Sequence, residues 1–195
     1  MALRPISESE IGERYLSWLN DPEITQYLEA RHITPSEQSI VDYINGLRST
    51  EGCELFAIFT KRESVHIGNL GISQNNPHNQ GLASYGQMIG DPKAQAMGLG
   101  GEVSALIVEF LFQNPNIHKV WGGVHAANVK AWQTSEYLGL RKEGTLRKHA
   151  VLPDGSYCDI YQYGILREEW QECRRKFAAI LKHMHVAELA QTPAG

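Results

Sequence analysis

Three glycines fall within four positions, at Gly98, Gly100 and Gly101, directly before the long apolar run EVSALIVEFLF. A glycine-rich turn that leads from a strand into a helix presents unpaired backbone N–H groups and the positive end of the helix dipole. Both features favour an anionic group such as a phosphate. The same glycines could instead permit only a tight turn, because glycine adopts positive φ without a steric cost. These residues therefore predict either an anion-binding loop or a structural corner.

The spacing of these glycines does not match two common phosphate-binding motifs. A P-loop needs Lys and then Ser or Thr after its last glycine, whereas this chain continues with Glu102 and Val103. A dinucleotide-binding fingerprint needs GxGxxG, and the glycines here read GxGG. The spacing that is present is Q-x-x-G-x-G, formed by Gln95, Gly98 and Gly100.

The composition is that of a globular protein. The chain has 195 residues, of which 42% are hydrophobic and 21% charged, and this suits one domain with a sizeable core. A net charge of −4 offers no basic field for nucleic acid or for an anionic membrane. No run approaches the roughly 18 apolar residues of a spanning helix. The opening MALRPISESE lacks the apolar segment of a secretory signal. We therefore expect no nucleic-acid partner and no membrane insertion.

The cysteines give no sign of a metal site or a disulfide framework. Cys53, Cys158 and Cys173 are odd in number and show neither CxxC nor His-paired spacing. Reduced thiols in a cytoplasmic protein are the simplest interpretation. The sequence therefore predicts a cytoplasmic location and no bound metal.

Apolar spacing and capping residues predict the elements that must position the glycine turn. Capping boxes at Ser7–Glu10 and Thr34–Glu37 begin the first two helices, and Gly139 ends a later one. Helices are predicted at 8–19, 35–48, 101–112 and 127–138, and strands at 54–61, 64–73, 82–90, 118–126, 144–152 and 156–166. From Arg167 onward the chain is charged and helical, and it ends in the loose segment AQTPAG. This order predicts a single α/β domain with a mixed sheet.

Several motifs in this order resemble those of a known superfamily. The spacing Q-x-x-G-x-G at Gln95, Gly98 and Gly100 is similar to the [QR]-x-x-G-x-[GA] motif of the GNAT superfamily of acyl-CoA-dependent N-acyltransferases. The resemblance extends over roughly residues 2–170, through LRPISESE, YGQMIGDP and NVKAW…EYLGL. The closing KEGTLRKHAVLPDGSYCDIYQYGIL resembles the hairpin of the RimJ/RimL-like branch. WLNDPEI and HIGNLGI look more like amino-sugar nucleotide N-acetyltransferases.

The resemblance implies a particular fold. It is an α/β single domain with a mixed, mostly antiparallel sheet flanked by helices, in which the central pair of strands splays apart. An acetyl-CoA-dependent N-acetyltransferase domain is expected at 1–170, followed at 171–195 by a C-terminal helical extension and a loose tail.

The resemblance also implies which residues bind the co-substrate acetyl-CoA. Backbone N–H groups from Met97 to Gly101 would hold the pyrophosphate, and an N–H of Met88 or Ile89 would stabilise the oxyanion. Asn128 begins the second CoA-contacting segment, although an Asn there could equally be a helix cap. The whole predicted set is Met88, Ile89, Gln95, Ala96, Met97, Gly98, Leu99, Gly100, Gly101, Asn128, Lys130 and Ala131. Ala96 and Met97 depart from the Gly and Lys of related sequences, which should weaken CoA binding modestly.

The catalytic residues are harder to carry over. Relatives place a Tyr that protonates the leaving thiolate at the position of Ser135, and Tyr137 lies about 200° further around the helix. We therefore favour Ser135 over Tyr137 as this acid. Ser84 stands where relatives often carry a Glu, so the general base is open. His66 is a candidate because of its ordinary pKa, and the other candidates are Glu54, His149, Asp159 and a water chain to a carboxylate.

The acceptor of the acetyl group is the least determined part of the resemblance. The N-terminal segments favour a nucleotide-linked amino sugar, whereas the closing hairpin favours the α-amino group of a ribosomal protein. A polyamine or an antibiotic amine is a further alternative. Because acid and base residues are missing, a non-catalytic CoA-binding module is an alternative of another class, as is a phosphate-binding protein unrelated to CoA. A homodimer is an assembly often found among the proteins it resembles.

Overall fold

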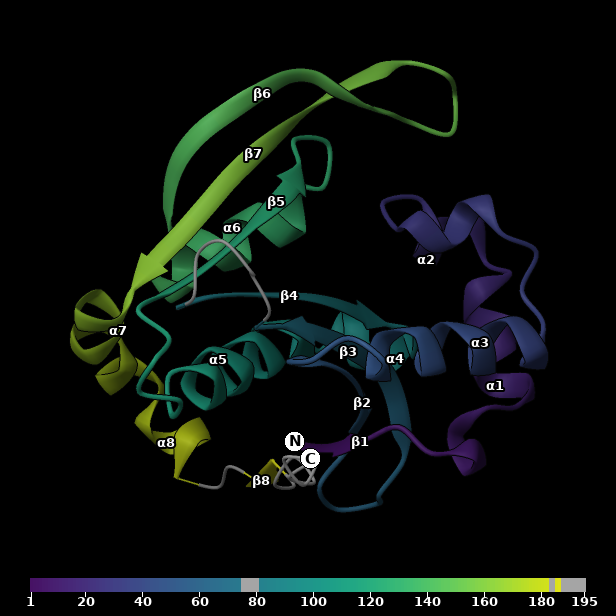
Figure 1. The fold of residues 1–195 in the computed structure, drawn as a ribbon, viewed down its shortest axis with the longest axis horizontal. Coiled ribbons are helices and arrows are strands. Elements are labelled where there is room, and N and C mark those ends of the chain that lie inside the picture. The colour runs from purple at the N-terminus through teal and green to yellow at the C-terminus, as the bar shows by residue number, and fades with distance from the viewer. Residues whose placement is uncertain (75–80, 183–184, 187–195) are drawn as a thin grey trace.

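A computed structural model shows one mixed sheet with helices on both of its faces (Figure 1). It describes residues 1–74, 81–182 and 185–186. The strands are β1 (Ala2–Pro5), β2 (Cys53–Phe59), β3 (His66–Ser73), β4 (Leu82–Ile89), β5 (Lys119–His125), β6 (Arg141–Val151), β7 (Tyr157–Leu166) and β8 (His185–Val186). Their order in the sheet is β6-β7-β5-β4-β3-β2-β1-β8. Pairing is parallel between β4 and β5 and between β1 and β8, and antiparallel elsewhere.

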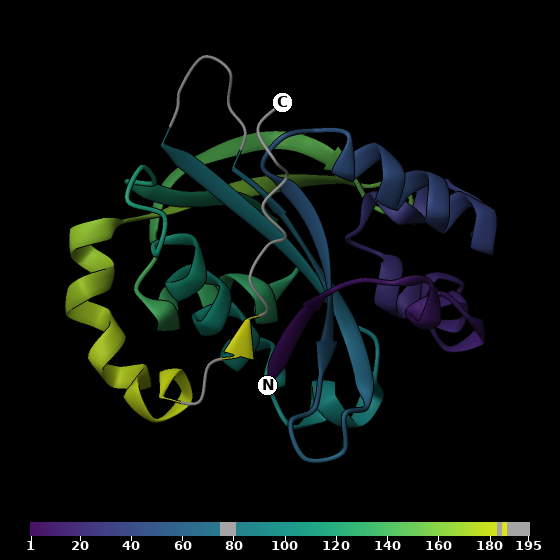
Figure 2. The ribbon, with the colours of Figure 1, turned by 60° about the horizontal axis from the view of Figure 1, so that its bottom comes forward.

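Two groups of helices pack on opposite faces of this sheet, and Figure 2 shows the sheet between α3 and α5. The first group consists of α1 (Glu13–Leu19), α2 (Pro22–Thr25) and α3 (Glu37–Arg48). The second consists of α4 (Pro92–Ala96), α5 (Leu99–Leu111), α6 (Val129–Leu138), α7 (Arg167–Cys173) and α8 (Ala178–Leu181). Short 3-10 turns lie at Glu8–Glu10, Glu29–His32 and Arg174–Phe177.

The core consists of two hydrophobic clusters because β2 and its neighbours are buried on both faces. Side chains alternate along a strand, so Phe56 and Ile58 join the cluster that contains α5, while Leu55 and Ala57 face α1 and α3. This double burial explains why LFAIF, residues 55–59, is a continuous apolar run. The predicted α/β class with a mostly antiparallel sheet is confirmed.

The central strands β4 and β5 diverge after a short paired stretch. They pair only over Leu82–Ser84 and Lys119–Trp121, although both strands continue for several residues beyond these positions. The predicted splay is therefore present. It leaves the last five residues of β4 without a partner strand on the β5 side.

The predicted start of the first two helices needs correction. Ser7 and Glu10 do form a capping box, but it opens a 3-10 turn, and α1 begins only at Glu13. The box of the second helix pairs Ser36 with Ser39, not Thr34 with Glu37, so α3 begins at Glu37. The Ser36 and Ser39 side chains accept hydrogen bonds from each other's backbone N–H groups, which is the reciprocal pattern of a capping box, two residues later than predicted.

The C-terminal segment packs with the domain. Trp170 and Phe177 are 1% and 2% exposed and belong to the cluster around α5, with their rings stacked at 5.7 Å. Side chains of the segment 171–182 therefore pack against the hydrophobic core. The AQTPAG tail lies outside the described residues. No helix in the part of the chain that the structure describes is long and apolar enough to cross a bilayer.

Candidate active site

The free edge of β4 directs backbone groups into the gap between β4 and β5. The N–H of Gly90 donates a hydrogen bond to the carbonyl of Ile67 at 2.9 Å. The preceding residues of β4, 84–89, pair with β3 in antiparallel register. Because alternate residues of an antiparallel pair face the partner strand, Met88 faces β3 and Ile89 faces the gap. Of the two predicted oxyanion donors, the geometry thus leaves the N–H of Ile89 available and commits that of Met88 to the sheet.

The turn between β4 and α5 is anchored at both ends. Asp91 caps α4, since its Oδ1 accepts a hydrogen bond from Ala94 N–H at 3.0 Å, and its Oδ2 pairs with Arg14 at 2.7 Å. These contacts, the backbone hydrogen bond first, hold the pKa of Asp91 below its usual value. Gln95 Nε2 donates to the Ile89 carbonyl at 2.6 Å. The Gln of the Q-x-x-G-x-G motif therefore ties the turn to the end of β4.

Gly98 is the N-cap of α5 and has a φ of +70°. A Cβ placed there would meet nothing within 4 Å, so the backbone of the turn is open to a ligand. The N–H groups of Met97, Gly98 and Gly101 already donate to backbone carbonyls, whereas those of Leu99 and Gly100 have no acceptor among the described residues. The turn fits the pyrophosphate of CoA with two free N–H groups and the helix dipole.

A cavity of about 220 Å³, which we call the slot cavity, lies between β4, β5 and α6. Gln87, Asn128, Ala131 and Ser135 are among its lining residues. Asn128 Oδ1 also accepts the Ala131 N–H at 3.3 Å, so this residue caps α6 and faces the cavity at once. Ala96, Met97 and Lys130 are exposed and do not line the cavity. The other predicted residues of the turn do not line it either.

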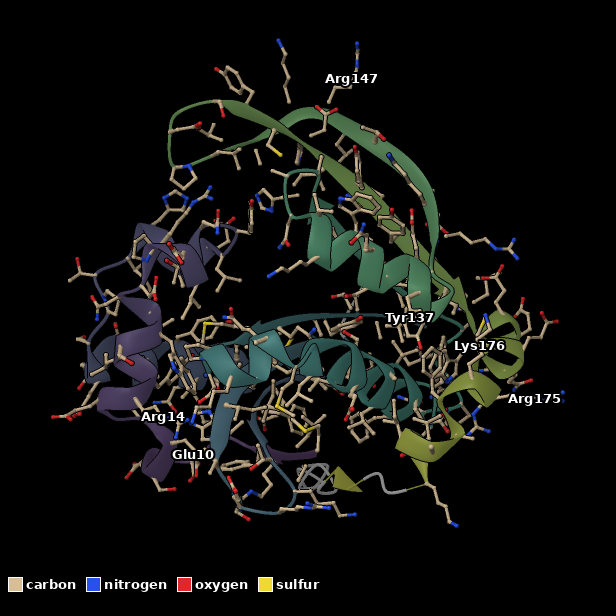
Figure 3. All side chains as sticks on the ribbon, turned by 180° about the vertical axis from the view of Figure 1, so that it is seen from behind. Glu10, Arg14, Tyr137, Arg147, Arg175 and Lys176 are labelled. Atoms are coloured by element: carbon tan, nitrogen blue, oxygen red, sulfur yellow. The ribbon has the colours of Figure 1, made fainter. Side chains whose placement is uncertain are left out.

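The structure brings Ser135 to the slot cavity and keeps Tyr137 away from it. Ser135 is 8% exposed, lines the cavity and donates its hydroxyl to the Ala131 carbonyl at 3.2 Å. Tyr137 is 67% exposed and lies beside the C-terminal segment (Figure 3), where its ring centre is 5.5 Å from that of Phe177. Two residues along an α-helix turn a side chain by about 200°, so Ser135 and Tyr137 point to different sides of α6. Tyr137 therefore has no contact with the candidate site.

Five hydroxyl groups that line the slot cavity were not predicted from the sequence. They belong to Tyr27, Thr134, Ser104, Tyr85 and Tyr163. Burial raises the pKa of Tyr85, and its hydrogen bond with Ser104 acts against this shift. Burial and a hydrogen bond to Glu136 at 2.8 Å raise the pKa of Tyr163 to about 12. Neither phenol is a strong acid at neutral pH.

A second cavity of about 550 Å³, which we call the α3 cavity, lies between β4 and the N-terminal helices. It shares Leu28, Tyr85, Gly86 and Gln87 with the slot cavity, so the two meet at the free edge of β4. Ser84 lines the α3 cavity. The position at which relatives often carry a Glu therefore faces this cavity, but it supplies a hydroxyl instead of a carboxylate.

His66 lies behind the α3 cavity rather than in it. Its ring is surrounded by Tyr15, Trp18 and Phe59, with ring centres 5.0 to 6.3 Å away. Burial lowers its pKa, and the hydrogen bonds of its ring act against this shift. Its Nε2 contacts the Gly68 carbonyl and Asn69 Oδ1, both at 3.0 Å. His66 lines neither cavity, so the geometry does not support the predicted role as general base.

The other candidate bases lie away from both cavities. Glu54 pairs with Arg48 at 3.2 Å. Asp159 accepts the Lys148 N–H at 2.7 Å, where β6 is irregular and Lys148 has a positive φ. His149 is exposed on β6. Asp159 thus shapes the hairpin.

Contacts join the N-terminal segment to the opposite side of the gap, at the end of β5 and in the β6–β7 hairpin. Tyr27 donates its hydroxyl to the Ala127 carbonyl at 3.2 Å, and its ring lies 5.4 Å from that of His125. Arg31 Nη2 donates to the Val151 carbonyl in the β6–β7 hairpin at 2.6 Å. These contacts hold Leu28 where both cavities meet.

The described residues contain no group of three or more His, Cys, Asp or Glu side chains arranged as metal ligands. The geometry is that of a CoA-dependent acyltransferase: a splayed strand pair, an open helix N-terminus beside it, and two cavities that meet between them. Residues 1–141 match the family model described as the acetyltransferase (GNAT) domain. The chain therefore belongs to this family, whose members use acetyl-CoA as a co-substrate.

Individual relatives are distant. The protein named uncharacterized N-acetyltransferase YnaD from Bacillus subtilis is 31% identical over 81 residues, which span 41% of this chain and 46% of that relative. Aminoglycoside N(6′)-acetyltransferase type 1 from Serratia marcescens is 20% identical over 90% of this chain and 87% of its own length. The crystal structure of spermidine N-acetyltransferase from Vibrio cholerae with CoA and spermine aligns with a TM-score of 0.74 at 21% identity. It covers 87% of this chain and 97% of that one, and supports the fold alone.

Proposed function

We propose that this protein transfers an acetyl group from acetyl-CoA to a primary amine by direct attack in a ternary complex. The observation that carries this proposal is the meeting of the two cavities at Tyr85–Gln87 on the free edge of β4. A thioester in the slot cavity and an amine in the α3 cavity would be held together there. Such positioning supplies a large share of the acceleration of a two-substrate reaction.

On the co-substrate side, backbone N–H groups make most of the proposed contacts. The N–H groups of Leu99 and Gly100 and the dipole of α5 bind the pyrophosphate. The thioester carbonyl accepts a hydrogen bond from Ile89 N–H, which stabilises the oxyanion that develops during attack. Asn128 and Ala131 line the slot that receives the pantetheine arm.

The chemical step follows from this placement. The neutral amine forms an N–C bond to the thioester carbon, the carbonyl becomes an oxyanion, and its collapse breaks the C–S bond and releases the thiolate. The Ser135 hydroxyl turns from the Ala131 carbonyl, to which it donates in the structure, and donates a hydrogen bond to this thiolate. The thiolate needs little help because a thiol has a pKa near 8.5. The amine loses its proton to water next to Ser84. The apolar walls of the α3 cavity assist, because burial lowers the pKa of an ammonium group.

A nucleotide-linked amino sugar is the acceptor that the N-terminal motifs favour, and the RimJ/RimL-like hairpin favours the α-amino group of a protein. The spermidine and aminoglycoside enzymes among its relatives make polyamines and antibiotic amines further candidates. We place the reaction in the cytoplasm on the basis of the three unpaired cysteines. A homodimer is the assembly that the resemblance favours.

The test is release of free thiol from acetyl-CoA, measured with UDP- and dTDP-amino sugars, N-terminal peptides, polyamines and simple amines. We expect saturable, amine-dependent release with at least one of them. Binding of acetyl-CoA without turnover on any amine would show a non-catalytic CoA-binding module. Binding of simple nucleotides without binding of acetyl-CoA would contradict the whole proposal.

A further inference from the structure

The α3 cavity has mostly apolar and aromatic walls. They include Tyr15, Leu19, Ile33, Ile40, Tyr43 and Leu55. Among the described residues that line it, Glu29 is the one with a charged side chain, and none is Lys or Arg. A polyamine or an aminoglycoside carries several positive charges that need carboxylates, and a nucleotide diphosphate needs cations. The described residues of these walls supply one carboxylate, that of Glu29, and no Lys or Arg.

The apolar surface continues onto the rim of the cavity. Ile33 and Tyr43 are each 51% exposed, although both are large hydrophobic residues. Tyr15, deeper in the cavity, is 5% exposed, and burial raises its pKa to about 12, so it is a neutral phenol. An apolar ligand would bury the rim, and burial of such side chains is favourable at roughly 25 cal/mol per Å².

Two buried polar atoms in these walls lack a hydrogen-bond partner among the described residues, Gln87 Oε1 and Asn69 Nδ2. Asn69 is 3% exposed, lines the cavity, and its Nδ2 has no hydrogen-bond acceptor among the described residues. His66 fixes which end of this amide is free. Its Nε2 contacts the Gly68 carbonyl, which can only accept, so Nε2 carries the proton and also donates to Asn69 Oδ1. The NH₂ group of Asn69 is thereby left as a buried donor, which is costly without an acceptor.

We propose that the acceptor is a small primary amine with an apolar or aromatic body, and that Asn69 Nδ2 donates a hydrogen bond to an oxygen on that body. His66 acts as a positioning residue that sets the orientation of the amide. The inference rests on the proposed function, because it describes the amine used in the same reaction. It replaces the amino-sugar nucleotide that the sequence favours, since the described walls carry no cation for its phosphates.

The first experiment compares amines at saturating acetyl-CoA by thiol release. The probes are 2-phenylethylamine, tyramine, 2-amino-1-phenylethanol, spermidine and a UDP-amino sugar. We expect the best aromatic amine to exceed spermidine and the amino sugar by at least about tenfold in kcat/KM, the value of roughly one well-made contact. If spermidine or the amino sugar is the best substrate, the inference is wrong while the proposed function stands.

A binding measurement separates the two kinds of failure. Saturation-transfer NMR detects each amine on the protein–CoA complex without any turnover. If no amine is acetylated, the proposed function fails, and binding of the aromatic amines in preference to spermidine still supports the inference about the cavity. Absence of binding by all three aromatic amines contradicts it.

The second experiment tests the buried donor with Asn69→Leu. In the wild type, at least one of the two oxygen-bearing amines should exceed 2-phenylethylamine in kcat/KM by about tenfold, the usual value of a hydrogen bond in a buried site. In the variant this ratio should fall to about one, mainly through KM. An unchanged ratio would overturn the role of Asn69. If the variant does not fold, the wild type alone decides. Equal kcat/KM values for the oxygen-bearing amines and 2-phenylethylamine would then overturn the role of Asn69.

Discussion

The two substrate sites that meet at β4 differ in how they would hold their ligands. In our proposal the co-substrate is held mainly by backbone groups beside the slot cavity, namely the free N–H groups of Leu99 and Gly100 and the gap-facing N–H of Ile89. The α3 cavity depends on side chains from β3, β4, α1, α3 and the 3-10 turn at Glu29–His32. Backbone recognition suits a ligand that all members of a family share, whereas side-chain walls suit a ligand that differs among them.

The largest effect should come from removal of a backbone donor on the co-substrate side. Ile89→Pro lacks the N–H that faces the gap, and proline is tolerated where a strand edge is unpaired. We expect kcat to fall by about 10²–10³, as for loss of an oxyanion donor. Ile89→Val is the matched control and should keep its activity. Steady-state kinetics with a parallel measurement of acetyl-CoA affinity checks this, and an equal loss in both variants would contradict the assignment.

A smaller but direct effect is expected on CoA affinity at the glycine turn. Gly98→Val places a β-branched residue at a φ of +70°, which costs about 1–3 kcal/mol. Acetyl-CoA binding should weaken by roughly ten- to hundredfold when measured by calorimetry. Gly155→Val is the control, because Gly155 has a φ of +83°, lies in the β6–β7 turn, and has equally open space where a Cβ would stand. If both variants bind acetyl-CoA equally, the turn does not hold the pyrophosphate.

The hydroxyl of Ser135 should matter less. Ser135→Ala removes a donor near the leaving thiolate, whose ordinary pKa near 8.5 already makes it a good leaving group. We expect kcat to fall by less than about tenfold, below the 10²–10⁴ typical of general acid catalysis. Tyr137→Phe is the control and should leave kcat unchanged. A larger loss in the Tyr137 variant would mean that this residue reaches the site in the working enzyme.

The smallest effect should be the contribution of His66 to stability, on the α3 side. Burial lowers the pKa of His66 in the folded state, so between that pKa and 6.5 the unfolded chain binds more protons than the folded one. Stability should therefore be highest above about pH 6.5 and fall on acidification. Urea unfolding between pH 7.5 and 5.5 should show a weaker pH dependence in His66→Gln than in the wild type. His125, whose pKa is also lowered, contributes to both proteins and cancels in the difference.

Local signals in the sequence predicted the backbone geometry of the glycine turn and of α6. Gly98 has the positive φ expected of the turn, Asn128 caps α6, and Gly139 ends that helix with a φ of +95°. Each of these features is set by residues close together in the chain. Helix geometry also predicted that Ser135 and Tyr137 would face different ways.

The α3 cavity could not be predicted in the same way. Glu29, Tyr43 and Asn69 come from three separate segments and share no spacing. His66 was proposed as a base from its residue type, but its neighbours in space, Asn69 and three aromatic rings, decide what it does. The capping boxes were assigned correctly in kind, but at α3 a serine pair replaced the expected partners. Tertiary contacts, not local propensity, set these outcomes.

The strand order has a consequence for how the protein is made. β7 lies between β5 and β6 in the sheet, and its Tyr163 completes a wall of the slot cavity. The hairpin that ends in β7 also receives the hydrogen bond from Arg31, 120 residues away from Val151 in sequence. Contacts of such long range form late and slow the folding of a domain. The slot cavity therefore cannot be complete on the ribosome before Tyr163 has emerged, whereas every lining residue of the α3 cavity precedes residue 89. The growing chain supplies the walls of the α3 cavity well before those of the slot cavity.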